Sequence, residues 1–494
     1  MKLILYNFLI ILFINIYFFS FSINRNYNLN CDIKYKCGLI DNFVNYLFFT
    51  VKDNIDKNSM NISLLNNEIN YNTNLKFSYK IEYKHFFNIK IKIGIYIVSL
   101  SNGGIERNTA LLINYLSRIQ IFEIYLFNNR KKDNEYKIPK NVKRIFFFSG
   151  RNNLKRNILM NNINIFIYQF YDAKTINMLN NMKNLKVILY NHSCFLLWIY
   201  INSNYIIKTI YNEYKNSKYV ISIVPFENDY LFKKWGINSI YMNNFLTYNY
   251  DRVIQSDLSS PIILMIGRGD DKNKRFILGI SSMKYIIKDI PESKMIVISS
   301  EKGLDNLKEL VRFLYLEKNI VFSGYTPNPE IYFKNSSLHI FPSISEAFPM
   351  VLAETKIYGI PSILLGIDYV ATSKEGTIII YDDNPELLGK FATKILKNEK
   401  YKKKLAKEAR RSMRKYKNEK LFKKWVKLIF SINKGKNCYQ TLKNRHKSIM
   451  QKESLNILNN QVNLLKKRIS LFENITANNI LNFSFINFFF FNHI

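Results

Sequence analysis

Two carboxylates, Glu346 and Glu354, are the sharpest candidates for chemistry in this sequence of 494 residues. Glu346 follows an apolar run, residues 338–341, that has the composition of a buried strand. Glu354 lies in residues 350–358, which predict a helix that stops at a Gly-Ile-Pro turn. The two groups are therefore expected just over two helical turns apart. Such a pair also arises by chance on surface helices, but after a buried strand it predicts acceptors for sugar hydroxyls.

Two cations follow another predicted strand, residues 262–267. Arg268 comes directly after it, and Lys274 is expected at the start of the next helix. A guanidinium fork and an ammonium point charge can converge on one pair of phosphates, so the two predict a diphosphate site. Lys272 and Arg275 on the same loop are expected to be solvated charges.

Two further strand ends carry weaker signals. Gly103 and Gly104 follow the apolar run 91–100 and precede a predicted helix. Glycines let a backbone approach a ligand, and a helix N-terminus favours an anion, although a plain tight turn explains the pair equally well. His192 follows the predicted strand 185–190. A lone histidine at a strand end is more often structural than functional.

The elements that must position these residues alternate in type. Strand-like runs occur at residues 91–100, 121–127, 142–148, 163–170, 185–190 and 219–224, and again at 262–267, 294–299, 320–323, 338–341, 362–365 and 377–381. Continuous apolar strands separated by helices predict parallel sheets covered on both faces. The fold class expected is therefore α/β, with two Rossmann-like domains facing a central cleft. Ligands would bind there, outside the carboxyl ends of the strands.

Taken together, these motifs resemble the retaining GT-B glycosyltransferases of family 4 (group 1) over roughly residues 90–430. The motifs are Glu346-x7-Glu354, the Gly267-Arg268 to Lys274 spacing, the loop Gly103-Gly104-Ile105-Glu106-Arg107 and the turn Gly359-Ile360-Pro361. The resemblance implies a nucleotide-sugar donor held mainly by the second domain and a glycan or lipid-linked acceptor held mainly by the first.

The resemblance also implies roles for single residues. Glu354 would hold the nucleotide ribose, and Glu346 would contact hydroxyls of the donor sugar. Arg268 and Lys274 would bind the diphosphate, and His192 matches the first domain's sugar-contacting histidine.

One position departs from the family pattern. Many members have glycine where this chain has Pro349, and proline has no N–H to donate near the diphosphate. The backbone amides of Phe348 and Met350 are expected to compensate.

The expected reaction is transfer of a hexose-type sugar with retention of configuration. Arg268 and Lys274 would stabilise the charge that grows on the leaving diphosphate. No side-chain nucleophile is evident, which fits front-face attack. The sequence contains no Asp-x-Asp, so neither a metal nor another cofactor is expected.

The charge balance raises two alternatives. Lys and Arg total 72 against 37 Asp and Glu, a net charge of +35, which first suggests nucleic acid. However, a bias toward residues with AT-rich codons inflates lysine, and no nucleic-acid-binding module is recognisable. A nucleic-acid-binding protein is therefore the less favoured alternative. A non-catalytic, membrane-associated scaffold that keeps the GT-B fold is the other.

The predicted organisation begins at the N-terminus with an uncharged run, residues 3–23, long enough to cross a bilayer. It predicts a signal anchor, with a cleaved signal peptide as the alternative. The modest positive bias after it places the catalytic domains in the cytosol, with a lumenal enzyme as the alternative. The predicted parts are 1–23 (anchor), 24–88 (Asn-rich spacer), 89–255 (acceptor domain), 256–431 (donor domain) and 432–494 (basic helical tail).

Overall fold

The computed structural model describes residues 90–435 apart from short gaps. The gaps are residues 102, 194–203, 226, 229–230, 232–235, 238, 269–270, 300–303, 327 and 368. The predicted anchor or signal peptide, the Asn-rich spacer and residues 436–494 of the predicted tail lie outside the described residues. The domain boundaries drawn from the sequence stay predictions.

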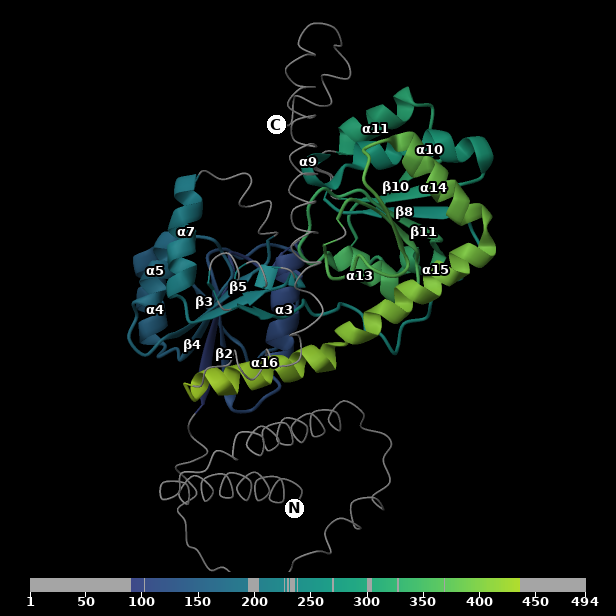
Figure 1. Ribbon diagram of the computed structural model, residues 1–494. Helices are drawn as coiled ribbons and strands as arrows, with labels where there is room; N and C mark the ends of the chain where they lie inside the picture. Colours follow the sequence, from purple (N-terminus) through teal and green to yellow (C-terminus); the bar gives the residue numbers. More distant parts are fainter. Residues whose placement is uncertain are drawn as a thin grey trace, which may run out of the picture. The chain divides into compact units, whose positions relative to one another are not determined.

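The first sheet has seven parallel strands in the order β3-β2-β1-β4-β5-β6-β7. They are β1 (Ile91–Tyr96), β2 (Phe122–Asn128), β3 (Lys143–Phe146), β4 (Ile165–Tyr168), β5 (Lys186–Asn191), β6 (Tyr219–Ser222) and β7 (Ser239–Tyr241). Its helices are α3 (Gly104–Leu116), α4 (Arg151–Met160), α5 (Ala173–Asn180) and α7 (Asn204–Asn216). Helices α4, α5 and α7 lie on one side of this sheet and α3 on the other (Figure 1). Because helices cover both faces, the strands are apolar throughout.

The second sheet has six parallel strands in the order β10-β9-β8-β11-β12-β13. They are β8 (Ile262–Ile266), β9 (Lys294–Ile298), β10 (Ile320–Phe322), β11 (Leu338–Phe341), β12 (Ser362–Leu365) and β13 (Thr377–Ile380). Its helices are α9 (Asp271–Lys274), α10 (Phe276–Asp289), α11 (Leu304–Phe313), α12 (Glu330–Asn335), α13 (Met350–Ile357), α14 (Pro385–Lys397) and α15 (Glu399–Ser412). The strand order reverses between β8 and β11, the place where doubly wound sheets bind ligands.

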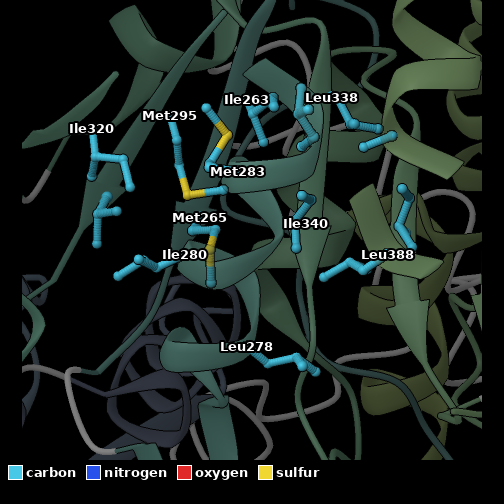
Figure 2. Packing of buried hydrophobic residues seen from close by; sticks show 14 of the residues in the cluster. Ile263, Met265, Leu278, Ile280, Met283, Met295, Ile320, Leu338, Ile340 and Leu388 are labelled. Atoms are coloured by element: carbon cyan, nitrogen blue, oxygen red, sulfur yellow. The ribbon is translucent and has the colours of Figure 1, made fainter. Parts of the chain in front are cut away.

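The core of the second sheet is built largely from isoleucine, leucine and methionine side chains (Figure 2). Met265 of β8, Met283 of α10 and Met295 of β9 are fully buried in it, beside Ile263 and Ile340. Flexible methionines fill the irregular space between helix and sheet. This packing fixes the carboxyl ends of β8 and β11, from which the candidate site is built.

The predicted α/β architecture with two parallel sheets is confirmed, and the differences are local. The last strand of the first sheet, Ser239–Tyr241, was not predicted, because three residues with only one aliphatic side chain make no detectable run. Lys274 was expected at the start of a helix but is the last residue of the short α9. The next helix, α10, begins at Phe276, after Arg275 in a left-handed conformation (φ 53°).

The chain divides into two compact units. One comprises Ile91–Leu421 together with Gly435–Ile494 and contains both sheets. The other comprises Met1–Lys90 and Phe422–Lys434, and its described part is mainly the portion of α16 (Asn418–Asn433) from Phe422 onward.

The prediction of a single-pass membrane protein needs correction. Within the described ranges, no helix combines the length and the apolar character that crossing a membrane requires. The longest of these helices, α16, has 16 residues and several lysines, whereas a span needs about 20 mostly apolar ones. The segment on which the prediction rested, residues 3–23, lies outside the described residues.

Candidate active site

Lys274 and Glu346 form an ion pair where two neighbouring strands of the second sheet end. Lys274 closes α9, which follows β8, and Glu346 lies in the loop after β11. Strands β8 and β11 are hydrogen-bonded to one another at the reversal of strand order. The structure thus joins two predicted site residues that are 72 positions apart in the sequence.

The loop that carries Glu346 is held in register by polar contacts. The Asn273 side chain donates to the Ser345 carbonyl oxygen and accepts from the Ser345 amide, both at 3.1 Å. The Glu346 amide donates to the Tyr369 hydroxyl at 3.1 Å. The side chains of Lys274 and Glu346 are only 16% and 14% exposed, so solvent screens their attraction incompletely.

A buried lysine, Lys356 of α13, anchors the loop that supplies Tyr369. Its ammonium donates to the carbonyl oxygens of Thr372 (2.6 Å) and Lys374 (2.7 Å). Lys356 is fully buried, and burial lowers its pKa to about 7. The ammonium thus ties α13 to the segment that positions the Glu346 backbone.

Glu354 has partners quite different from those of Glu346. Arg107 of α3 donates from Nη1 to Glu354 Oε1 at 2.7 Å. The Thr247 hydroxyl, in the connection between the two sheets, donates to the same oxygen at 2.5 Å. The second oxygen, Oε2, is buried and has no hydrogen-bond partner among the described residues. Glu354 is therefore a shielded carboxylate with one occupied and one unoccupied acceptor.

The glycine loop is shaped around a carboxylate of its own helix. A Cβ on Gly103 would lie only 1.9 Å from Glu106 Oε2, whereas a Cβ on Gly104 would make an ordinary contact with Met350 at 3.7 Å. Burial raises the pKa of Glu106, and the positive charge of Arg268 partly opposes that shift. At the helix start, where the sequence predicts either an anion site or a plain tight turn, Gly103 faces the Glu106 carboxylate, and Arg268 lies nearby.

His192 follows β5 and is held by a polar network. Its Nε2 lies 2.8 Å from Gln169 Oε1, and the Gln169 amide nitrogen donates to the Tyr96 carbonyl oxygen at 3.2 Å. Because that carbonyl can only accept, it fixes the orientation of the Gln169 amide, and His192 Nε2 must carry the proton. His192 Nδ1 is then the unprotonated nitrogen.

Burial lowers the pKa of His192 to about 3, so the ring is neutral. The Tyr190 ring packs against it with centroids 4.1 Å apart. A neutral imidazole can accept a hydrogen bond from a hydroxyl and so position it, but it cannot act as a cation near neutral pH.

Phe348 and Met350 contribute packing through their side chains. The buried Phe348 ring packs edge-on against Tyr416, with centroids 5.6 Å apart and an angle of 77°. Met350 opens α13, and its side chain lies near Gly104 at the start of α3. Pro349 occupies the N-cap position in an extended conformation (φ −68°). Pro349 itself has no N–H, so the expectation that the backbone amides of Phe348 and Met350 donate to a ligand stays a prediction.

Sequence reasoning did not assign roles to four residues that build this region. Arg107 was visible beside the two glycines, and Lys356 interrupts an otherwise largely apolar helix. Gln169 is a polar residue within an apolar strand-like run. Thr247 carries no local signal, because its role depends entirely on the connection between the sheets.

Comparison with known families agrees with this architecture. Residues 249–412, which include Arg268, Lys274, Glu346 and Glu354, match the family model described as "Glycosyl transferases group 1". The chain therefore carries a glycosyltransferase group 1 domain with a GT-B-like fold.

Individual relatives are distant. The chain is 26% identical over 164 residues to a poly(glycerol-phosphate) alpha-glucosyltransferase of Bacillus subtilis, an alignment that covers 32% of this chain and 24% of the relative. It is 22% identical over 365 residues to an uncharacterized glycosyltransferase of Haemophilus influenzae, covering 68% and 99% of the two chains. Sucrose-phosphate synthase from Thermosynechococcus elongatus is similar in structure, with a TM-score of 0.59, 14% identity and coverage of 70% and 100%. At that identity the likeness concerns the fold alone.

Proposed function

We propose that this protein is a retaining glycosyltransferase that moves a hexose-type sugar from a nucleotide-sugar donor to a sugar or lipid-linked acceptor. The observation that carries the proposal is the Lys274–Glu346 ion pair at the reversal of strand order, inside the matched group 1 domain. A cation and a carboxylate side by side suit a ligand that is anionic at one end and rich in hydroxyls at the other.

Each residue then has a chemical task. An ammonium has three N–H groups, so Lys274 can keep Glu346 as a partner and still donate to a phosphate oxygen. Arg268 adds a second cation, and together they stabilise the charge that develops on the leaving diphosphate. Glu346 accepts hydrogen bonds from hydroxyls of the transferred sugar, and Glu354 accepts one from the nucleotide ribose.

Retention follows from front-face attack in this proposal. The acceptor hydroxyl approaches the anomeric carbon on the side from which the diphosphate departs, and the leaving phosphate oxygen takes the acceptor proton. No protein nucleophile and no metal ion are required. The first sheet, with neutral His192, would contribute contacts to the sugar.

The first test is a thermal-shift screen against UDP-, GDP- and ADP-sugars, because a ligand of the native state raises its stability. Transfer with the donor that binds is then measured for Lys274→Met and Arg268→Ala. Each should lower turnover by about 10²- to 10³-fold, the usual cost of losing one group that stabilises a developing charge. Lys284→Met, an exposed lysine on α10, is the matched control and should have no effect.

Two results would contradict the proposal. One is the absence of any bound nucleotide sugar, which would favour a scaffold that has only the fold. The other is an equal loss of activity in Lys284→Met and Lys274→Met, which would indicate general surface charge. The stereochemistry is checked separately by NMR of the product's anomeric proton.

A further inference from the structure

Three consecutive residues at the end of α9 make side-chain contacts with two different loops. Asn273 and Lys274 both reach the loop after β11, through the hydrogen bonds and the ion pair described above. Arg275 instead donates from Nη1 to Asp383 Oδ2 at 3.0 Å, in the loop between β13 and α14. Both side chains of this second ion pair are only 22% exposed, so the prediction that Arg275 is a solvated charge is wrong.

The backbone of Arg275 makes this divergence possible. Its φ of 53° and ψ of 43° lie in the left-handed region, which places Cβ close to a carbonyl oxygen and is unfavourable for arginine. The Arg275 carbonyl oxygen accepts from the amides of Leu278 (3.1 Å) and Gly279 (3.3 Å), so α10 begins directly after this residue. The chain thus changes direction between Lys274, which faces the site, and Phe276, which is buried in the core.

The position of the Lys274 ammonium depends on this turn. The aliphatic part of its side chain passes over the end of β8, where a Cβ on Gly267 would lie 3.5 Å from Lys274 Cγ and Cδ. The ammonium lies 5.2 Å from the centroid of the Phe341 ring at the end of β11. A different conformation at residue 275 would move Lys274 away from these contacts and from Glu346.

We propose that Arg275 and Asp383 are positioning residues whose ion pair holds residue 275 in the left-handed conformation and so directs Lys274 toward Glu346 and the donor diphosphate. This inference rests on the proposed function. The pair joins residues 108 positions apart, and its low exposure limits screening by solvent. It therefore offsets a backbone conformation that arginine by itself disfavours.

The test measures kcat and the KM of the donor that the thermal-shift screen identifies. Arg275→Met and Asp383→Asn remove the ion pair at nearly constant volume. Each should lower kcat by about tenfold or more, as expected when a group that acts in the transition state is misplaced, with a smaller change in KM. Arg275→Gly also lacks the pair, but glycine adopts the left-handed conformation without strain and should recover much of the kcat that Arg275→Met loses.

A second set of variants separates positioning from a general loss of structure. In a Lys274→Met background, Asp383→Asn should lower kcat little further, because no ammonium remains to be positioned. A general loss of folded protein would lower kcat by the same factor in both backgrounds. Asp289→Asn is the matched control: it breaks an exposed ion pair of the same length, 3.0 Å to Lys397, and should leave kcat unchanged.

The outcomes distinguish this inference from the proposed function. A wild type that transfers sugar from no nucleotide-sugar donor overturns both. With an active wild type, an unchanged kcat in Arg275→Met and Asp383→Asn overturns the inference alone. The same holds if Arg275→Gly is no more active than Arg275→Met, or if Asp383→Asn costs the same factor with and without the Lys274 ammonium.

Discussion

Replacing Lys356 by methionine should change how the stability of this protein depends on pH. The Lys356 ammonium is fully buried, and its neighbours include the positive Lys415 and the negative Glu375. Burial and Lys415 lower its pKa to about 7, while Glu375 acts in the opposite direction. Methionine has a similar length and volume but no charge, so the variant isolates the contribution of this one titration.

The sign and size of the effect follow from linkage. The pKa of Lys356 is about 7 in the folded chain and 10.5 in the reference state, so between these values the unfolded chain binds more protons. The free energy of unfolding must therefore rise with pH in this window. Integrated from about pH 6 to about pH 9, Lys356 contributes a rise of about 3 kcal/mol, which Lys356→Met should lack.

The assay is urea denaturation of the wild type and of Lys356→Met at several pH values between these limits. Other groups that titrate in this range affect both proteins equally and cancel in the difference. Lys394→Met, an exposed lysine on α14, is the matched control and should follow the wild type.

Parallel stability curves for the wild type and Lys356→Met would refute this reasoning. They would mean that the carbonyl oxygens of Thr372 and Lys374 keep the ammonium protonated throughout the range. A difference of the opposite sign would show that the lysine is more basic in the folded chain than in the unfolded one.

Three further outcomes are expected. The pH profile of activity should show no ionisation near pH 6.5 from His192, whose pKa is about 3. Gln169→Glu should raise the pKa of His192, because a carboxylate favours the charged ring; NMR signals of the ring follow the titration. Gly376→Ala should lower the free energy of unfolding by more than Gly324→Ala, since both have positive φ but only at Gly376 would the new Cβ lie 2.3 Å from a backbone nitrogen, that of Ala409. Transfer should persist in excess EDTA, because the expected diphosphate clamp consists of Arg268 and Lys274; complete loss restored by Mn²⁺ would contradict it.

The fold was largely predictable because its signal is local. Apolar runs such as Ile262–Ile266 and Leu338–Phe341 must be covered on both faces of a sheet. The helices predicted between such runs provide that cover and connect parallel strands, so the sequence predicts parallel sheets. The three-residue strand β7 escaped because it has too few apolar residues to stand out. The helix boundary at Lys274 escaped because nothing in the sequence requires Arg275 to adopt a left-handed conformation.

Residue type and strand position by themselves identified Glu346, Glu354, Arg268 and Lys274 as candidates, because parallel strands carry their ligand-facing residues at their carboxyl ends. The sequence could not assign their partners. Lys274 pairs with Glu346, and Glu354 takes Arg107, only because the chain packs segments 72 and 247 residues apart against one another. Protonation likewise depends on burial, which no local pattern reports: the same side chain is a solvated cation on a surface and, at Lys356, a base whose pKa is about 7.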